Sequence, residues 1–261
     1  MAKIEINQRS VEVQPGEMLL GVLRREGVSI PTLCHMEDLL PSGACRMCVV
    51  EVDGAPTLVP SCAYPVVDGM KVQTHSPRAV RARKTIVELL LANHPDDCLY
   101  CVRNNNCQLQ ELAGELGVRQ RRYAGEKSVR TLDLSSPSLV RDPAKCILCG
   151  KCVRMCEEIQ GVAASDFIGR GSKTRIGTAF DAGLNVSSCI CCGQCVQVCP
   201  TGALREQSSL KEVIEAINDP NRFVTVQHAP AVSVTIGEMC GLLAGLDSAG
   251  RAYVSPIVTG S

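Results

Sequence analysis

Two unbroken runs of four cysteines constrain this chain more than any other feature of its sequence. The runs are Cys146-x2-Cys149-x2-Cys152-x3-Cys156 and Cys189-x2-Cys192-x2-Cys195-x3-Cys199, the second followed directly by Pro200. A 4Fe-4S cluster needs four thiolates that converge from different directions, and the two short gaps wrap the backbone around three of its corners. Each run therefore predicts three ligands of one cluster.

The fourth cysteine of each run is out of reach of that cluster and is expected to complete the other one, as in two-cluster bacterial ferredoxins. The predicted ligand sets are Cys146, Cys149, Cys152 and Cys199 for one cluster, and Cys156, Cys189, Cys192 and Cys195 for the other. Zinc is the alternative, but structural zinc sites use two separated pairs rather than unbroken runs. Cys191 has no slot in this pattern and is expected to be a small packing residue near a cluster.

A second set, Cys34-x10-Cys45-x2-Cys48-x13-Cys62, lies in a part of the chain with strand-like patterns. Gly43 lets the backbone approach inorganic sulfide, and the β-rich unit around the set favours a 2Fe-2S cluster. The gap of ten residues departs from the plant-type spacing, so zinc remains open on spacing alone. His35 matches no ligand slot and is expected on the surface.

A third set combines one histidine with three cysteines, His94-x3-Cys98-x2-Cys101-x5-Cys107. By ligand chemistry alone, such a set suits either zinc or a 4Fe-4S cluster. Its place between a 2Fe-2S unit and a ferredoxin-like pair favours the cluster, because a redox-inactive ion would interrupt a series of electron carriers. A neutral imidazole in place of a thiolate also changes the net charge of the cluster, and therefore its reduction potential.

Composition agrees with ligand sets rather than a disulfide scaffold. The 261 residues include 17 cysteines in tight groups, and no tryptophan.

The N-terminus shows no secretory signal, so we expect a reducing, cytoplasmic setting in which free thiolates persist. The longest mostly apolar run, residues 231–246, is short and contains Glu238, so no membrane span is expected. A net charge of zero gives no electrostatic basis for binding nucleic acid or an anionic membrane. The basic cluster of Arg119, Arg121 and Arg122 is expected to be a solvated face.

Local patterns predict an α+β chain. Alternating apolar residues indicate a hairpin around a turn at residues 7–10, followed by a helix over residues 17–26 that Gly27 ends. Further strands are expected at residues 49–54 and 70–72. A helix should then begin with Ser76 as N-cap and Pro77 at its first position. The apolar residues expected on its inward face are Val80, Ile86, Val87, Leu90 and Leu91.

Later patterns are weaker. Residues 118–145 indicate a connector without clear periodicity. Ser209 and Glu212 predict a capping box at the start of an amphipathic helix that ends at residues 219–221. Residues 223–226 predict a strand. The expected domains are therefore a 2Fe-2S domain at 1–76, a short helical 4Fe-4S segment at 77–118, a two-cluster domain at 119–206 and an α/β tail at 207–261.

The three ligand sets, in this order, resemble the N-terminal region of FeFe hydrogenases and of the large iron–sulfur subunit of the NADH dehydrogenase complex (complex I). The resemblance covers roughly residues 1–206. It implies a β-grasp 2Fe-2S domain, a 4Fe-4S segment with one histidine ligand and a two-cluster ferredoxin domain. The ligands it implies are Cys34, Cys45, Cys48 and Cys62 for the first, and His94, Cys98, Cys101 and Cys107 for the second.

Residues 225–238 resemble the opening of the hydrogenase catalytic domain, but Cys240 is the only cysteine after Cys199. The hydrogen-activating cluster of that family is therefore expected to be absent, leaving no catalytic residue. The resemblance implies a shortened electron-transfer subunit of a cytoplasmic, NAD(P)-linked complex of the hydrogenase type, a class that includes electron-bifurcating hydrogenases. Its expected partners are a flavin/NAD(P)H-binding iron–sulfur subunit, a catalytic subunit and soluble ferredoxin. The alternatives are the same role in a formate dehydrogenase or NADH/NADPH transhydrogenase complex, or a truncated FeFe hydrogenase.

Overall fold

The structure, a computed structural model, describes residues 2–120, 122–125, 131–225, 227, 229–239, 241–243 and 245. The chain divides into two compact units, Met1–Gln207 and Ser208–Ser261, and each is described by itself. Among the described residues, no helix has the length and apolar character needed to cross a membrane.

The first unit begins with a mixed five-stranded sheet in the order β2-β1-β5-β3-β4. Its strands are β1 (Ala2–Ile6), β2 (Arg9–Val13), β3 (Val49–Val52), β4 (Val59–Pro60) and β5 (Lys71–Gln73). β1 pairs antiparallel with β2 and parallel with β5, while β3 pairs antiparallel with both β4 and β5. Helix α1 (Leu19–Arg25) buries Leu19, Leu20, Val22 and Leu23 in the same core as the strands.

The first hairpin is tighter than predicted. Asn7 and Gln8 have φ of 48° and 69°, so they form a two-residue turn of the kind that matches strand twist. Arg9 and Ser10, expected in the turn, instead pair with Ile6 and Glu5. The two strands are therefore longer than the apolar alternation indicated.

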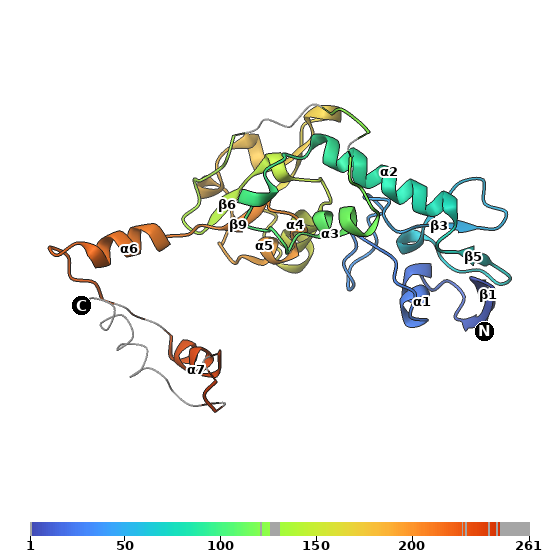
Figure 1. The fold of residues 1–261 in the computed structure, drawn as a ribbon, viewed down its shortest axis with the longest axis horizontal. Helices are drawn as coiled ribbons and strands as arrows, with labels where there is room; N and C mark the ends of the chain where they lie inside the picture. Colours follow the sequence, from blue (N-terminus) through green and yellow to red (C-terminus); the bar gives the residue numbers. More distant parts are fainter. Residues whose placement is uncertain are drawn as a thin grey trace. The chain divides into compact units, whose positions relative to one another are not determined.

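Helix α2 (Pro77–Asn93) begins as predicted, because the Ser76 hydroxyl accepts a hydrogen bond from the Ala79 amide at 3.2 Å. It packs on β3 and on helix α3 (Gln108–Glu115) (Figure 1). The predicted inward face was wrong at Val80, which is 37% exposed.

Two charged residues of α2 take buried places that the apolar pattern did not predict. Arg83 is 2% exposed and donates hydrogen bonds to the carbonyls of Val49 and Thr74. Glu88 is 1% exposed and accepts the guanidinium of Arg122. Arg119 and Arg122 are exposed, as expected for a solvated face, and the Arg122 guanidinium also pairs with the buried carboxylate of Glu88; Arg121 lies outside the described residues.

The rest of the first unit is built from short elements. The helices are α4 (Lys151–Arg154), continued by a π turn at Met155–Ile159, and α5 (Gln194–Val198); the strands are β6 (Leu139–Arg141), β7 (Asp166–Ile168), β8 (Arg175–Gly177) and β9 (Leu204–Glu206). β6 pairs with β9 and β7 with β8, both antiparallel. Short 3₁₀ turns lie at Ser61–Ala63, Cys98–Tyr100, Pro143–Lys145, Gly171–Lys173, Ala179–Asp181 and Leu184–Val186. Cysteine-bearing loops join these elements.

The described part of the second unit holds two helices, α6 (Leu210–Asn218) and α7 (Pro230–Met239). Asp219 follows α6 as predicted, but the Ser209 side chain makes no capping hydrogen bond, so the predicted capping box was wrong. Residues 223–225 form no strand, and Val226 lies outside the described residues. The predicted α/β character of this region was therefore wrong for its described residues, whose helices are α6 and α7 and which form no strand.

Candidate iron–sulfur sites

The first cysteine set gathers beside the five-stranded sheet. Cys34, Cys45 and Cys48 lie on the loop between α1 and β3, and Cys62 lies on the 3₁₀ turn after β4. The thiols form two hydrogen-bonded pairs, Cys34 with Cys45 and Cys48 with Cys62. The hydrogen bond from each partner lowers the pKa of Cys34 to about 5 and of Cys48 to about 6, and raises the pKa of both partners. Four sulfurs are thus grouped as two adjacent pairs.

Backbone turns within the loop shape this group. Gly43 has a φ of 62°, the left-handed conformation that glycine adopts without strain, and Arg46 follows at 59° between two cysteines. The Cys45 amide points at Cys34 Sγ at 3.4 Å. His35, expected on the surface, is half-buried. Burial lowers its pKa, and the positive charge of Arg24 lowers it further.

The third set follows the C-terminal end of α2. His94 is the C-cap residue of that helix and is buried. Loss of hydration raises the pKa of the Cys98 thiol, and the nearby thiols of Cys107 and Cys101 raise it further. The structure therefore brings the three cysteines together, with His94 four positions before the first of them.

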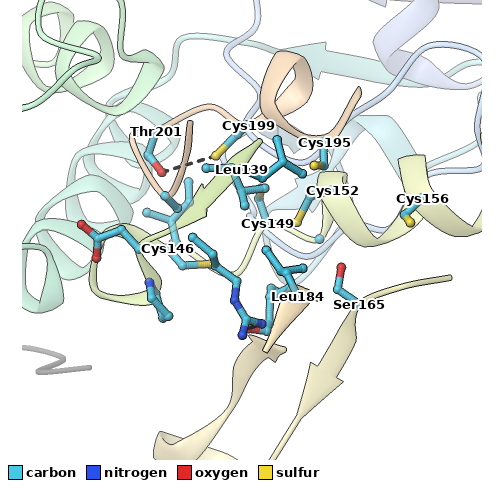
Figure 2. Close-up of a pocket in the computed structure, with 18 of the residues that line it drawn as sticks. Leu139, Cys146, Cys149, Cys152, Cys156, Ser165, Leu184, Cys195, Cys199 and Thr201 are labelled. Atoms are coloured by element: carbon cyan, nitrogen blue, oxygen red, sulfur yellow. Dashed lines mark hydrogen bonds between the residues drawn. The ribbon is translucent and has the colours of Figure 1, made fainter. Parts of the chain in front are cut away.

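The two four-cysteine runs meet around one apolar cavity. It is lined by Cys146, Cys149, Cys152, Cys156, Cys189, Cys195 and Cys199, together with Leu139 and Leu184. Figure 2 shows Cys149, Cys152, Cys195 and Cys199 around this space, with Cys199 beside Thr201. Burial raises the pKa of Cys149 to about 12, and Cys199 and Cys146 add to the rise. Cys152 is shifted upward in the same way.

The fourth cysteine of each run lies with the other run. Cys199 is among the thiols that raise the pKa of Cys149 and Cys152, after burial itself. Cys156, Cys189 and Cys192 are the thiols that act on Cys195, whose pKa burial raises to about 11. A second, smaller cavity is lined by Cys156, Cys189, Cys192 and Cys195.

The two runs also share one backbone conformation. Leu148 and Cys191 occupy the same position of the two runs, with φ of 55° and 56°, and Gly150 and Gly193 match at 77° and 74°. Cys191 is exposed, so the expectation that it packs inside was wrong. It occupies the turn position that Leu148 fills in the first run.

Iron–sulfur clusters fit these residues. Backbone amides point at candidate ligand sulfurs, namely Leu148 at Cys146 Sγ (3.4 Å), Ala164 at Cys156 Sγ (3.3 Å) and Cys191 at Cys189 Sγ (3.5 Å). Such amides tune the potential of a cluster. Seven cysteines line one cavity, and sulfurs that surround a cavity suit a group larger than a single metal ion.

An apolar cluster joins three of the cysteine-bearing loops. Leu33 and Met47 come from the first set, Leu109 from helix α3 after the third, and Ile147 from the first four-cysteine run. Leu33, Met47 and Leu109 are at most 1% exposed. Because these side chains are buried, the packing between the loops is apolar, and electrostatic interactions beside it act at a lower effective dielectric constant.

The sequence did not predict two cations at the contact between the loop of the His94 set and the loops that carry Cys146 and Cys199. Arg103 donates to the Cys199 carbonyl at 2.7 Å, and Lys145 pairs with Asp97 at 2.9 Å. Both lie close to cysteines in the sequence, but only the fold shows that they connect different ligand sets.

Comparison with known proteins assigns three segments of this chain. Residues 1–77 match a 2Fe-2S iron–sulfur cluster binding domain. Residues 83–122 match the iron–sulfur binding region of NADH-ubiquinone oxidoreductase-G. Residues 136–205 match the ferredoxin-like domain of NADH-quinone oxidoreductase subunit 3. Together with the grouped cysteines, these matches define an iron–sulfur electron-transfer protein.

Relatives that are longer than this chain narrow the family to which it belongs. The chain is 41% identical over 257 residues to NADP-reducing hydrogenase subunit HndD of Solidesulfovibrio fructosivorans, covering 96% of this chain and 44% of the relative. It is 36% identical over 186 residues to the mitochondrial 78 kDa subunit of NADH-ubiquinone oxidoreductase of Neurospora crassa, covering 70% of this chain and 25% of the relative. The chain thus spans less than half the length of these relatives.

A solved structure extends the likeness to three dimensions. A crystal structure of an NAD⁺-reducing [NiFe]-hydrogenase in the H₂-reduced state contains a chain that matches with a TM-score of 0.74 and 31% identity. The match covers 80% of this chain and 88% of that one. The protein therefore belongs to the family of iron–sulfur electron-transfer subunits related to NAD(P)-linked hydrogenases and complex I.

Proposed function

We propose that this chain relays electrons between a flavin/NAD(P)H-binding subunit and a hydrogenase-type catalytic subunit or soluble ferredoxin, within a cytoplasmic complex. The observation that carries the proposal is the grouping of the cysteines along one unit of the chain, with members of both four-cysteine runs lining a shared cavity. The sixteen described cysteines are thiols rather than disulfides, which suits a reducing compartment.

The proposed cofactors are one 2Fe-2S and three 4Fe-4S clusters, which supply one-electron redox chemistry. In the first set, the pairs Cys34/Cys45 and Cys48/Cys62 would each hold one iron. The remaining proposed ligand sets are His94, Cys98, Cys101 and Cys107; Cys146, Cys149, Cys152 and Cys199; and Cys156, Cys189, Cys192 and Cys195. We propose domains at 1–76, 77–118, 119–206 and 207–261 with a β-grasp fold for the first.

The protein's own contribution is to hold the ligands in place and to keep water out. Amide–sulfur hydrogen bonds orient the thiolates, and the apolar cluster around Leu33, Met47, Leu109 and Ile147 separates the sites from solvent. No side chain is assigned as an acid, base or nucleophile. The proposal of a hydrogenase complex is supported by similarity to two proteins, an NADP-reducing hydrogenase subunit and a chain of an NAD⁺-reducing [NiFe]-hydrogenase.

The test is reduction by companion subunits. The chain is purified anaerobically from its native source, and its co-purifying proteins are identified. Addition of NADH or NADPH to the complex should bleach the visible absorption of this chain, and hydrogen should do the same through the catalytic subunit. A chain that dithionite bleaches but neither NAD(P)H nor hydrogen reduces would contradict the proposed partners.

A further inference from the structure

Two of the candidate ligand sets meet at a direct contact. The loop after Cys199 lies against Cys101 of the His94 set, so closely that a Cβ atom on Gly202 would be 2.7 Å from Cys101 Sγ. The Gln108 amide donates to the Pro200 carbonyl at 3.0 Å across the same contact. A side chain at position 202 would require Cys101 or the loop to shift.

Two cations, one from each of the two ligand sets, connect the loops at this contact. Arg103, between Cys101 and Cys107, donates from Nη2 to the Cys199 carbonyl at 2.7 Å. Lys145, directly before Cys146, pairs with Asp97, directly before Cys98, at 2.9 Å. Each interaction ties the loop of the His94 set to the set that contains Cys146 and Cys199.

Lys145 is the shielded member of its ion pair. The Lys145 side chain is 13% exposed, against 41% for Asp97, and it has a second carboxylate, Asp142, at 3.7 Å. Its backbone is held as well, because the Thr201 hydroxyl donates to the Lys145 carbonyl at 2.8 Å. A pair of exposed ions contributes little, whereas the shielding of Lys145 lowers the effective dielectric constant around its charge.

Arg103 carries a second hydrogen-bond donor, its Nε–H group. Its Nε is buried and has no hydrogen-bond partner among the described residues. An unpaired buried N–H is costly unless an acceptor is supplied, and Arg103 lies between two candidate cysteine ligands. A thiolate or sulfide acceptor in the His94 set would satisfy it.

We propose that Lys145 and Arg103 are positioning residues that hold the His94 set against the Cys199 set and tune the electron step between them. This inference rests on the proposed function. The step moves one electron, so one site is oxidised and the other reduced, and no bond or proton changes place. Positive charge at the contact favours the reduced form of both sites, which is the more negative one.

The test compares Lys145→Met and Arg103→Met with Lys173→Met, which removes one positive charge from an exposed position in the same region. Each reconstituted full-length chain is assayed for iron, for midpoint potentials, and for magnetic coupling between reduced clusters by paramagnetic resonance. We expect unchanged iron, lower potentials for the two adjoining 4Fe-4S sites, weaker coupling between them and an unchanged 2Fe-2S potential. Lys173→Met should match the unaltered chain.

The variant Asp97→Asn distinguishes the effect of charge on the two potentials from the effect of the ion pair on the coupling between the clusters. It removes a negative charge, so the two potentials should rise, but it breaks the same ion pair, so the coupling should weaken as in Lys145→Met. If the Met variants lose iron, recovery of iron and coupling in Lys145→Arg and Arg103→Lys supports the positioning role, and failure of these conservative variants overturns it.

Potentials and coupling in both Met variants equal to those of the unaltered chain would overturn the inference and leave the proposed function standing. The proposed function fails separately, if the unaltered chain shows no 4Fe-4S signals at all.

Discussion

The sheet domain and the ferredoxin-like region hold their cysteines by different means. Residues 2–73 share one core of seventeen buried side chains, fifteen of them other than cysteine. Residues 139–206 have eight buried apolar side chains other than cysteine, and only three of these, Leu139, Leu184 and Val196, form a common cluster. The sheet domain thus surrounds its site with an independent core, whereas the second region has only a small common cluster besides the site itself.

The longest elements follow the same division, although β4 and β5 of the sheet domain have only two and three residues. The sheet domain has a five-residue hairpin pairing and a helix with four buried apolar residues. In the ferredoxin-like region, each of the four strands has three residues and helix α4 has four. Such short elements are marginal without tertiary support, so bound clusters should supply most of the folding free energy there.

Removal of iron should have the largest effect. Anaerobic chelation should unfold residues 139–206, because that region has few buried apolar side chains, while residues 2–73 stay folded. Amide hydrogen exchange of the chelated and reconstituted chains measures both regions in one experiment. Simultaneous loss of protection in the two regions would show that the sheet domain depends on its bound cluster as much as the ferredoxin-like region does.

Substitution of one exchanged cysteine should be more selective. We expect Cys156→Ala to lose one 4Fe-4S signal and about four iron atoms, because Cys156 would serve the second run rather than its own. Cys191→Ala, at an exposed cysteine outside the ligand sets, is the control and should keep all its iron. Iron analysis with paramagnetic resonance distinguishes them. Equal iron in both variants would remove Cys156 from the proposed ligands.

His94→Ala should perturb a single 4Fe-4S signal and leave the 2Fe-2S signal intact, because the two ligand sets share no residue. His35→Ala is the matched control, since His35 is a half-buried histidine outside the pattern. Paramagnetic resonance of the reduced variants gives the comparison. Unchanged spectra in His94→Ala would mean that this imidazole binds no cluster.

The smallest effect should come from the core of the sheet domain. Leu20 is 1% exposed, so Leu20→Ala should lower the free energy of unfolding of this domain by about 3 kcal/mol without loss of iron. Leu40→Ala, at an 83% exposed leucine, should change it little. Denaturant unfolding followed by hydrogen exchange provides the values. Iron loss in Leu20→Ala would indicate that this core and its site are not separable.

Local signals in the sequence predicted the features that depend on neighbouring residues. The Ser76 cap, the end of α1 at Gly27 and the cysteine groups all follow from spacing and from turn chemistry. The Phe223 strand and the Ser209 cap failed because a short pattern was assigned without knowing its tertiary contacts.

Long-range partners could not be predicted in this way. Arg83 and Glu88 look like surface residues until β3 and Arg122 are packed against α2. The Lys145–Asp97 pair joins residues 48 positions apart, and no periodicity connects them. A sequence pattern records which residues prefer burial, but the partner of a buried charge is fixed only by the fold.

The most direct test is the metal content of the anaerobically reconstituted chain. Iron and acid-labile sulfide analysis, with Mössbauer spectroscopy to separate cluster types, should give about 14 iron atoms per chain, an equal amount of sulfide and three 4Fe-4S clusters for each 2Fe-2S cluster. Stoichiometric zinc with iron near zero would contradict the account, because no electron carrier would remain.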